Sequence, residues 1–178
     1  MNDLNVRLKA VLEAFIFSSQ EPVSFKHIQK FYPDLKEDTF RMIIKEINDE
    51  YKASFRPFHI VELAMGWVLV TREEFSDDLK KMHKHTMKMR LSKAALETLA
   101  VIAYKQPITK IEIEKLRGVD SVHMLKNLLK RKLICMNGRK DVPGCPILYV
   151  TTDQFLRHFG LKHLQDLPRV DEFVKVVE

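Results

Sequence analysis

Residues 106–118, QPITKIEIEKLRG, decide the fold of the second half of this 178-residue chain. Pro107 ends the helix before it, because proline lacks the backbone N–H that an interior helical position donates. Thr109 and Glu112 have the spacing of a capping box, in which each side chain accepts a hydrogen bond from the other's backbone N–H. Gly118 can adopt the left-handed conformation that closes a helix. The segment is therefore predicted to be a short helix with a defined start and end.

The sequence on both sides of this segment predicts further helices and a hairpin. The predicted elements are helices over 92–104, 121–132 and 153–159 and strands over 133–136 and 147–152. Ser92, Ser121 and Asp153 are the expected N-caps, since short polar side chains accept hydrogen bonds from the first N–H groups of a helix. Asn137-Gly138 is typical of a tight turn between two strands. The second half is therefore predicted to hold three helices, a hairpin and a final helix.

The first half repeats this plan. Its apolar spacing predicts helices over 3–18, 24–31 and 36–52, strands over 58–63 and 67–71, and a helix over 73–85. Glu21-Pro22-Val23-Ser24 matches Gln106-Pro107-Ile108-Thr109 at an offset of 85 residues, and Leu12-Glu13 matches Leu96-Glu97 at an offset of 84. Similarity within a chain at a nearly constant offset indicates a repeated structural unit.

Three helices followed by a hairpin is the order of a winged-helix domain. The chain is therefore predicted to be mainly α with small β wings, an α+β fold built from tandem winged-helix domains. The basic, Met-rich segment Lys84–Arg90 is the expected domain boundary. The predicted domains are residues 1–86 and 87–168, with a short C-terminal tail over 169–178.

Several classes of protein are disfavoured by the sequence. The five glycines stand apart, so neither a phosphate-binding loop nor a dinucleotide fingerprint is present. His83 and His85 are two residues apart, and their rings would point away from each other on a helix, which disfavours a shared metal ion. Cys135 and Cys145 are too few for a disulfide framework. We expect a non-enzymatic protein of the cytoplasm, without a cofactor, a metal site, a signal peptide or a membrane span.

The charge of the chain is unevenly distributed. The net charge is +6, of which residues 1–90 contribute +1 and residues 91–178 contribute +5. The predicted helix 36–52 carries four basic and five acidic residues, so it is rejected as a DNA reader. The predicted helix 121–132 carries no acidic residue, and four of its side chains are candidates for a weak DNA contact: Lys126, Lys130, Arg131 and Lys132. A winged-helix transcription regulator that uses this helix is the alternative function.

Apolar side chains surround most of the predicted helix 94–104. A helix that is apolar all round is buried on more than one side, either inside its own domain or against a partner. The candidate partner-binding residues on the helices of the second domain are Leu99, Ile102, Tyr104, Met124 and Leu128. The predicted first wing is rich in large apolar residues, of which Phe55, Phe58, Trp67 and Leu69 are candidates for a homodimer interface.

The second half resembles the segregation and condensation protein B family. The resemblance rests on the run from Leu91 to Thr109 around Tyr104-Lys105-Gln106-Pro107, on Ile113 to Val119, and on the loop Val142 to Pro146. It extends through Leu148-Tyr149, Thr151-Thr152 and Phe155-Leu156 to Leu167-Pro168. It covers residues 90–168 closely and residues 4–85 by architecture. The family commonly has Gly-Arg-Pro where this chain has Gly144-Cys145-Pro146, which leaves the role of position 145 open.

The resemblance implies an accessory subunit of the bacterial condensin-like SMC complex. Such a subunit forms a homodimer through its first winged helix and binds the kleisin subunit, segregation and condensation protein A. The kleisin would connect it to the SMC ATPase only indirectly, and any DNA contact would be weak or indirect. Gln106 and Arg117 then join the candidate kleisin-binding residues. The expected role is chromosome condensation and segregation in the cytoplasm, in association with the nucleoid.

Overall fold

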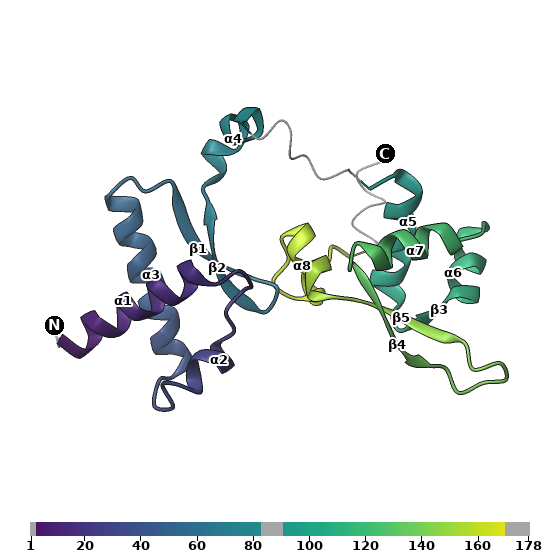
Figure 1. Ribbon diagram of the computed structural model, residues 1–178, viewed down its shortest axis with the longest axis horizontal. Helices are drawn as coiled ribbons and strands as arrows, with labels where there is room; N and C mark the ends of the chain where they lie inside the picture. Colours follow the sequence, from purple (N-terminus) through teal and green to yellow (C-terminus); the bar gives the residue numbers. More distant parts are fainter. Residues whose placement is uncertain (1–2, 83–90, 170–178) are drawn as a thin grey trace. The chain divides into compact units, whose positions relative to one another are not determined.

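The chain divides into two compact units, Met1–Met87 and Lys88–Glu178. The computed structural model describes residues 3–82 and 91–169. The predicted boundary after residue 86, the Lys84–Arg90 segment, the pair His83 and His85, and most of the predicted tail lie outside the described residues. Figure 1 colours the first unit from purple to teal and the second from teal-green to yellow.

The first unit consists of helices followed by a hairpin. Its elements are α1 (Asp3–Ser18), α2 (Phe25–Gln29), α3 (Glu37–Ala53), β1 (Phe58–Leu63), β2 (Gly66–Thr71), the 3₁₀ turn η1 (Glu73–Phe75) and α4 (Ser76–Met82). The Ser24 side chain caps α2 by accepting a hydrogen bond from the His27 N–H. The helix predicted from residue 73 instead begins with the separate turn η1.

The core of the first unit lies between α1, α2, α3 and one face of the hairpin. The buried face of α3 is the predicted stripe Phe40, Ile43, Ile44, Ile47 and Tyr51. Ile60 of β1 pairs with Leu69 of β2, and both side chains pack against this stripe. Val23 and Trp67 exchange two backbone hydrogen bonds of 2.9 Å, which fix the segment before α2 to the start of β2.

The second unit repeats this order with one additional short strand. Its elements are α5 (Lys93–Lys105), β3 (Ile108–Thr109), α6 (Lys110–Arg117), α7 (Val122–Lys130), β4 (Ile134–Arg139), β5 (Ile147–Thr151), α8 (Asp153–Phe159) and the 3₁₀ turn η2 (Leu164–Asp166). The antiparallel sheet has the order β3-β5-β4. The predicted capping box of Thr109 and Glu112 is confirmed, and Gly118 closes α6 with φ of 70°.

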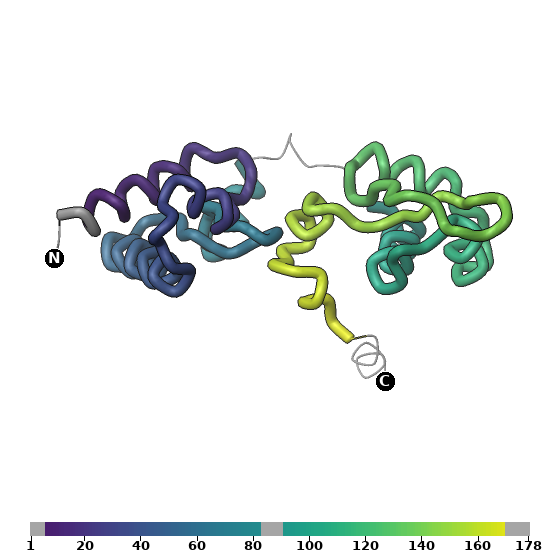
Figure 2. The backbone as a smooth tube through the Cα atoms, turned by 90° about the horizontal axis from the view of Figure 1, so that it is seen from below, coloured from purple at the N-terminus to yellow at the C-terminus, as the bar shows by residue number. Residues whose placement is uncertain are grey.

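Three local predictions in the second unit are wrong. Ser121 stands at the N-cap position of α7, but its side chain accepts no capping hydrogen bond. Asn137-Gly138 lies inside β4, where Gly138 has φ of 75° and the strand register shifts. The same left-handed conformation serves a bulge as well as a turn, and the chain reverses later, over residues 140–146 (Figure 2). Thr152, not Asp153, caps α8, since its side chain accepts from the Phe155 N–H.

The fold is a mixture of helices and small antiparallel sheets, as predicted for the α+β class. Three helices precede a hairpin in each unit, and a further helix follows it. Among the described residues, no helix combines the length and apolar character needed to cross a membrane.

Candidate protein-binding surfaces

An apolar hollow of about 250 Å³ opens on the first unit between α1 and α2. Its floor is formed by Leu12 and Ile28, which are almost completely buried. Val11, Phe31 and Tyr32 line its exposed edge, and Phe31 keeps 69% of its surface open to solvent. Pockets for drug-sized ligands measure roughly 300–1,000 Å³. The hollow is therefore suited to one or two side chains of a protein partner.

A row of rings connects this hollow to the body of the unit. The Phe15 ring stacks on His27 with 5.5 Å between centroids and an interplanar angle of 14°. His27 in turn contacts Phe31 at 5.5 Å. The backbone N–H of Phe31 donates to the Ile28 carbonyl. These contacts hold an exposed aromatic side chain in one position, which lowers the entropy cost of using it as an anchor.

Three of the four predicted homodimer residues pack against the core of the first unit instead of projecting from it. Phe58, Trp67 and Leu69 are partly buried against the core cluster. Phe58 makes an edge-to-face contact with Tyr51 at 5.0 Å, and Trp67 makes one with Phe40 at 5.5 Å. Phe55 is different, because 93% of its surface is exposed where α3 ends.

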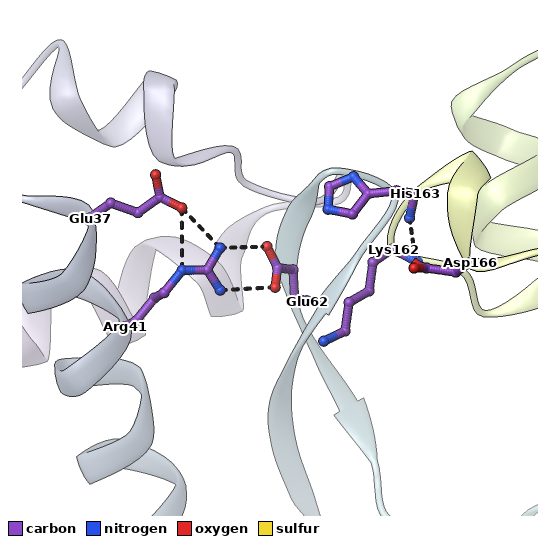
Figure 3. A network of polar contacts seen from close by, with 6 residues as sticks. All are labelled: Glu37, Arg41, Glu62, Lys162, His163 and Asp166. Atoms are coloured by element: carbon purple, nitrogen blue, oxygen red, sulfur yellow. Dashed lines mark hydrogen bonds and ion pairs between the residues drawn. The ribbon is translucent and has the colours of Figure 1, made fainter.

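Arg41 covers the outer side of Trp67. Its guanidinium lies 5.3 Å from the centroid of the Trp67 ring. The same group donates to both Glu62 oxygens at 3.0 Å and to Glu37 at 2.9 and 3.2 Å (Figure 3). The hydrogen bonds to Glu62, followed by those to Glu37, raise the pKa of Arg41. This network joins α3 to β1 and explains why Trp67 belongs to the hairpin packing.

The apolar circumference of α5 is explained by burial inside the second unit. Leu99, Ile102 and Leu128 have at most 1% of their surface exposed. These three predicted kleisin-binding side chains therefore lie in the core of the unit, and a partner on its surface would not contact them directly. α5 is the central helix of its unit, in contact with α6, α7 and β5, and this central position requires apolar residues on several faces.

Gln106 and Arg117 hold the second unit together. The Gln106 side chain accepts from the Thr151 N–H at 2.6 Å, and its amide donates to the Thr151 hydroxyl at 2.9 Å. Arg117, whose side chain is only 7% exposed, forms an ion pair with Glu97 at 3.3 Å and donates to the Ser121 hydroxyl at 3.2 Å. Both side chains have hydrogen-bond partners within the unit, and their predicted part in kleisin binding stays a prediction.

Two hollows flank the C-terminal end of α5. One is lined by Tyr104 and the segment 164–169, and the Tyr104 hydroxyl donates to the Pro168 carbonyl at 2.6 Å. The other measures about 370 Å³ and is lined by residues of α5, α6 and the turn between them: Lys105, Pro107, Ile108, Glu112, Lys115 and Leu116. Leu116, one of these lining residues, is 57% exposed, and Ile111, on the same helix α6, is 68% exposed. Met124, the remaining candidate, is half-buried.

Several surface residues were not predicted from the sequence. Phe31 is the last residue of the predicted helix 24–31, Tyr32 follows it outside any predicted element, and Ile111 and Leu116 lie in the predicted helix that Gly118 closes. The sequence does contain a signal for all four: each is a large apolar residue outside the apolar stripe with which the helix that contains or precedes it would pack on the unit. Deciding which apolar positions stay uncovered requires the packing of neighbouring elements.

Glu112 anchors the base of the β4–β5 connection. Its carboxylate accepts hydrogen bonds from the Lys140 ammonium group and from the backbone N–H and hydroxyl of Thr109. These bonds, that from Lys140 first, lower the pKa of Glu112 to about 2. One carboxylate thereby connects α6 and β3 with the end of β4, close to Pro107 in the chain.

The described residues contain no group of three His, Cys, Asp or Glu side chains arranged to hold a metal ion. Cys135 and Cys145 are both exposed and unpaired as thiols.

Comparison with known proteins gives a consistent family assignment. The family model described as segregation and condensation complex subunit ScpB matches residues 10–170. Segregation and condensation protein B of Syntrophotalea carbinolica is 42% identical over 173 residues, which cover 97% of this chain and 87% of that protein. The protein of the same name from Clostridium tetani is 39% identical over 170 residues, covering 96% and 89% respectively.

A solved structure also aligns with most of the chain. The crystal structure of a conserved hypothetical protein from Chlorobium tepidum is 37% identical, covers 90% of this chain and 100% of its own, and has a TM-score of 0.46. Since the family model spans nearly all of the sequence and relatives of about 40% identity match over almost their whole length, this chain belongs to the segregation and condensation complex subunit ScpB family.

Proposed function

We propose that this protein is a non-enzymatic accessory subunit of the SMC complex that acts as a homodimer and binds the kleisin subunit. Through the kleisin it would be connected indirectly to the SMC ATPase, in the cytoplasm and in association with the nucleoid. Membership of the ScpB family supports the proposal that the protein is a subunit of the SMC complex. Two observations support two protein contacts: an apolar hollow beside the exposed Phe31 on the first unit, and a hollow on the second unit in which Pro107, Ile108 and the exposed Leu116 lie among charged side chains.

Both units are proposed to be winged-helix domains. The support is the order of three helices followed by an antiparallel hairpin, which occurs twice. α3 and α7 would be the third helices, and the hairpins β1–β2 and β4–β5 would be the wings.

The hollow between α1 and α2 is the proposed homodimer surface. A twofold interface is made by the same patch on both subunits, so the patch must be complementary to itself. This one contains both a projecting ring, Phe31, and a hollow that can receive one. Of the four predicted homodimer residues, Phe58, Trp67 and Leu69 would support this surface from the core, and Phe55 would remain a direct alternative contact.

We expect Phe31→Asp to convert the dimer into a monomer. The charge would face an apolar hollow in the partner, where an unpaired carboxylate is strongly disfavoured. Light scattering should change from about twice the 20.9 kDa chain mass to that mass. The fold should persist, because substitutions at exposed positions usually change stability by less than about 0.5 kcal/mol.

Phe55→Asp is the matched control, since it places the same charge on another exposed phenylalanine of the first unit. It should leave the mass unchanged. A dimer that survives Phe31→Asp but not Phe55→Asp would move the interface to the end of α3. A wild-type protein that is monomeric at tens of micromolar would refute the homodimer.

The hollow beside Pro107 is the proposed kleisin surface. The hollow on the Tyr104 side is already lined by the chain's own segment 164–169, whereas the other is lined by the exposed Leu116 of α6, the helix that also carries the exposed Ile111. Apolar side chains around a hollow of this size suit the anchor residues of an extended or helical peptide.

We expect the double change Ile111→Asp and Leu116→Asp to weaken kleisin binding at least tenfold. Anchor residues of an interface typically contribute about 2 kcal/mol or more each, so a tenfold loss is a lower limit. Isothermal titration of the purified kleisin into the dimer measures it. Leu96→Asp, on an exposed position of α5, should bind normally. If all three proteins bind equally, the kleisin contacts another surface; if the wild type does not bind, the proposed function is refuted.

A further inference from the structure

The second unit contains a 20-residue stretch without a single acidic side chain. Residues 121–140 include six basic residues and no Asp or Glu: Lys126, Lys130, Arg131, Lys132, Arg139 and Lys140. The stretch comprises α7, the turn after it and β4, which follow one another directly (Figure 1). Its charge is therefore concentrated on two adjacent elements of one rigid unit.

One face of α7 is not covered by the rest of its unit. His123, Lys126, Asn127 and Lys130 are exposed, at the spacing of a single helix face, while Leu125 and Leu128 point into the core. The exposed face thus carries two ammonium groups, an imidazole and an amide, and no carboxylate. These are groups that donate hydrogen bonds to phosphate oxygens.

The positive charge continues from α7 onto β4. Lys132 is exposed immediately after the helix, and Arg139 is exposed at the end of the strand. The Arg139 guanidinium donates to the Cys145 carbonyl at 3.0 Å, which holds it beside the connection to β5. Lys140 differs from these, because Glu112 neutralises it. Four exposed cations thus remain on these two elements: Lys126, Lys130 and Lys132 on α7 and directly after it, and Arg139 at the far end of β4. Together with the exposed face of α7 they are called the strip.

We propose that this strip, defined by His123, Lys126, Asn127, Lys130, Lys132 and Arg139, binds the sugar–phosphate backbone of duplex DNA without reading its sequence. Four lysine and arginine side chains can each displace a counterion from the duplex. Base readout needs side chains that are available for paired hydrogen bonds in the major groove. The Asn127 oxygen already accepts from the Arg131 Nε–H at 2.8 Å, and lysines dominate the rest of the strip.

This interaction goes beyond the proposed function, because it requires neither the kleisin nor the second copy. Protein contacts are assigned to the apolar hollows on α1–α2 and beside Pro107, and the strip includes none of their lining residues. A subunit that holds a kleisin through one surface and touches DNA through another would add a weak DNA contact to the complex.

Fluorescence anisotropy of two 30-base-pair duplexes of unrelated sequence tests the inference with the full-length protein. We expect equal binding of both duplexes, with Kd values in the micromolar range at low salt. Four phosphate contacts predict a slope of about −3.6 for log K against log salt, so affinity should fall roughly 100-fold between about 50 and 200 mM. Nanomolar binding of one duplex only would indicate base readout and overturn the inference.

The double change Lys126→Glu and Lys130→Glu should weaken DNA binding more than tenfold. The matched control is Lys45→Glu with Lys52→Glu, which makes the same change in net charge at exposed positions of α3 in the other unit. An equal loss in both variants would mean that only net charge matters, and undetectable wild-type binding would also refute the inference. If the α7 variant loses kleisin binding and DNA is not bound, the strip serves an acidic protein segment instead.

Discussion

Ile102→Asp is expected to unfold the second unit and leave the first unit folded. Ile102 has no exposed surface, so the change removes a buried aliphatic side chain and places a carboxylate among apolar groups. The first effect costs about 2–5 kcal/mol, and burial of an unpaired charge adds to it. A domain of this size has a stability near the lower end of about 5–15 kcal/mol. The destabilisation from the two effects together is therefore comparable with the whole free energy of unfolding of the unit.

Two-dimensional NMR of amide groups distinguishes the two units. In Ile102→Asp, resonances of residues 91–169 should collapse to the narrow range of an unfolded chain, while those of 3–82 stay dispersed. Ile111→Asp introduces the same charge on an exposed isoleucine of the same unit and should keep every resonance dispersed. A folded Ile102→Asp protein that has lost only its partner would place this residue on the surface and contradict the structure.

Gly66→Ala is expected to destabilise the first unit by about 1–3 kcal/mol, the usual cost of adding an atom to a filled site. A Cβ atom at position 66 would lie 2.8 Å from the carbonyl carbon and the Cβ of Pro22 and 2.9 Å from its carbonyl oxygen. These atoms belong to backbone or to a rigid ring, so they can move only if the Val23–Trp67 pairing shifts. That pairing positions the segment leading into α2, which forms one side of the α1–α2 hollow.

Denaturant titration of wild-type and variant protein measures this change from the midpoint of the first unit's transition. Thr71→Ala, at the exposed end of the same strand, should shift stability by less than about 0.5 kcal/mol. We also expect Gly66→Ala to weaken the dimer, because it displaces the support of Phe31. Unchanged stability would mean that Pro22 and the hairpin are free to separate.

The helix limits were predictable because they are encoded locally. Ser92 accepts from the Ala95 N–H, and Thr109 with Glu112 and Gly118 set the ends of α6 within ten residues of sequence. The stripe on α3 was equally predictable, since a helix that packs on one face repeats its apolar residues every three or four positions. The α+β class and the repeated order followed from these elements.

Which apolar residues are exposed to solvent could not be predicted in the same way. Leu99 and Ile102 on α5 looked like an excess apolar surface because the sequence does not reveal that α6, α7 and β5 surround this helix. The exposure of Phe31 could not be predicted from its apolar character alone, because it depends on how α1 packs beside α2. Asn137-Gly138 is compatible with either a turn or a bulge, and pairing of Arg139 with Ile147 further along the strand decides between them.

The clamp between Gln106 and Thr151 offers a spectroscopic reporter for the second unit. The Thr151 amide proton is bonded to a side chain at the very end of α5, 45 residues earlier in the chain. The chemical shift of that proton depends on the length of this one hydrogen bond. Gln106 is followed directly by Pro107, which lines the adjoining hollow. A peptide bound in the hollow is therefore expected to change the chemical shift of the Thr151 amide, although Thr151 lies on a strand that the peptide need not contact. This one NMR signal would then report binding of the kleisin to the subunit.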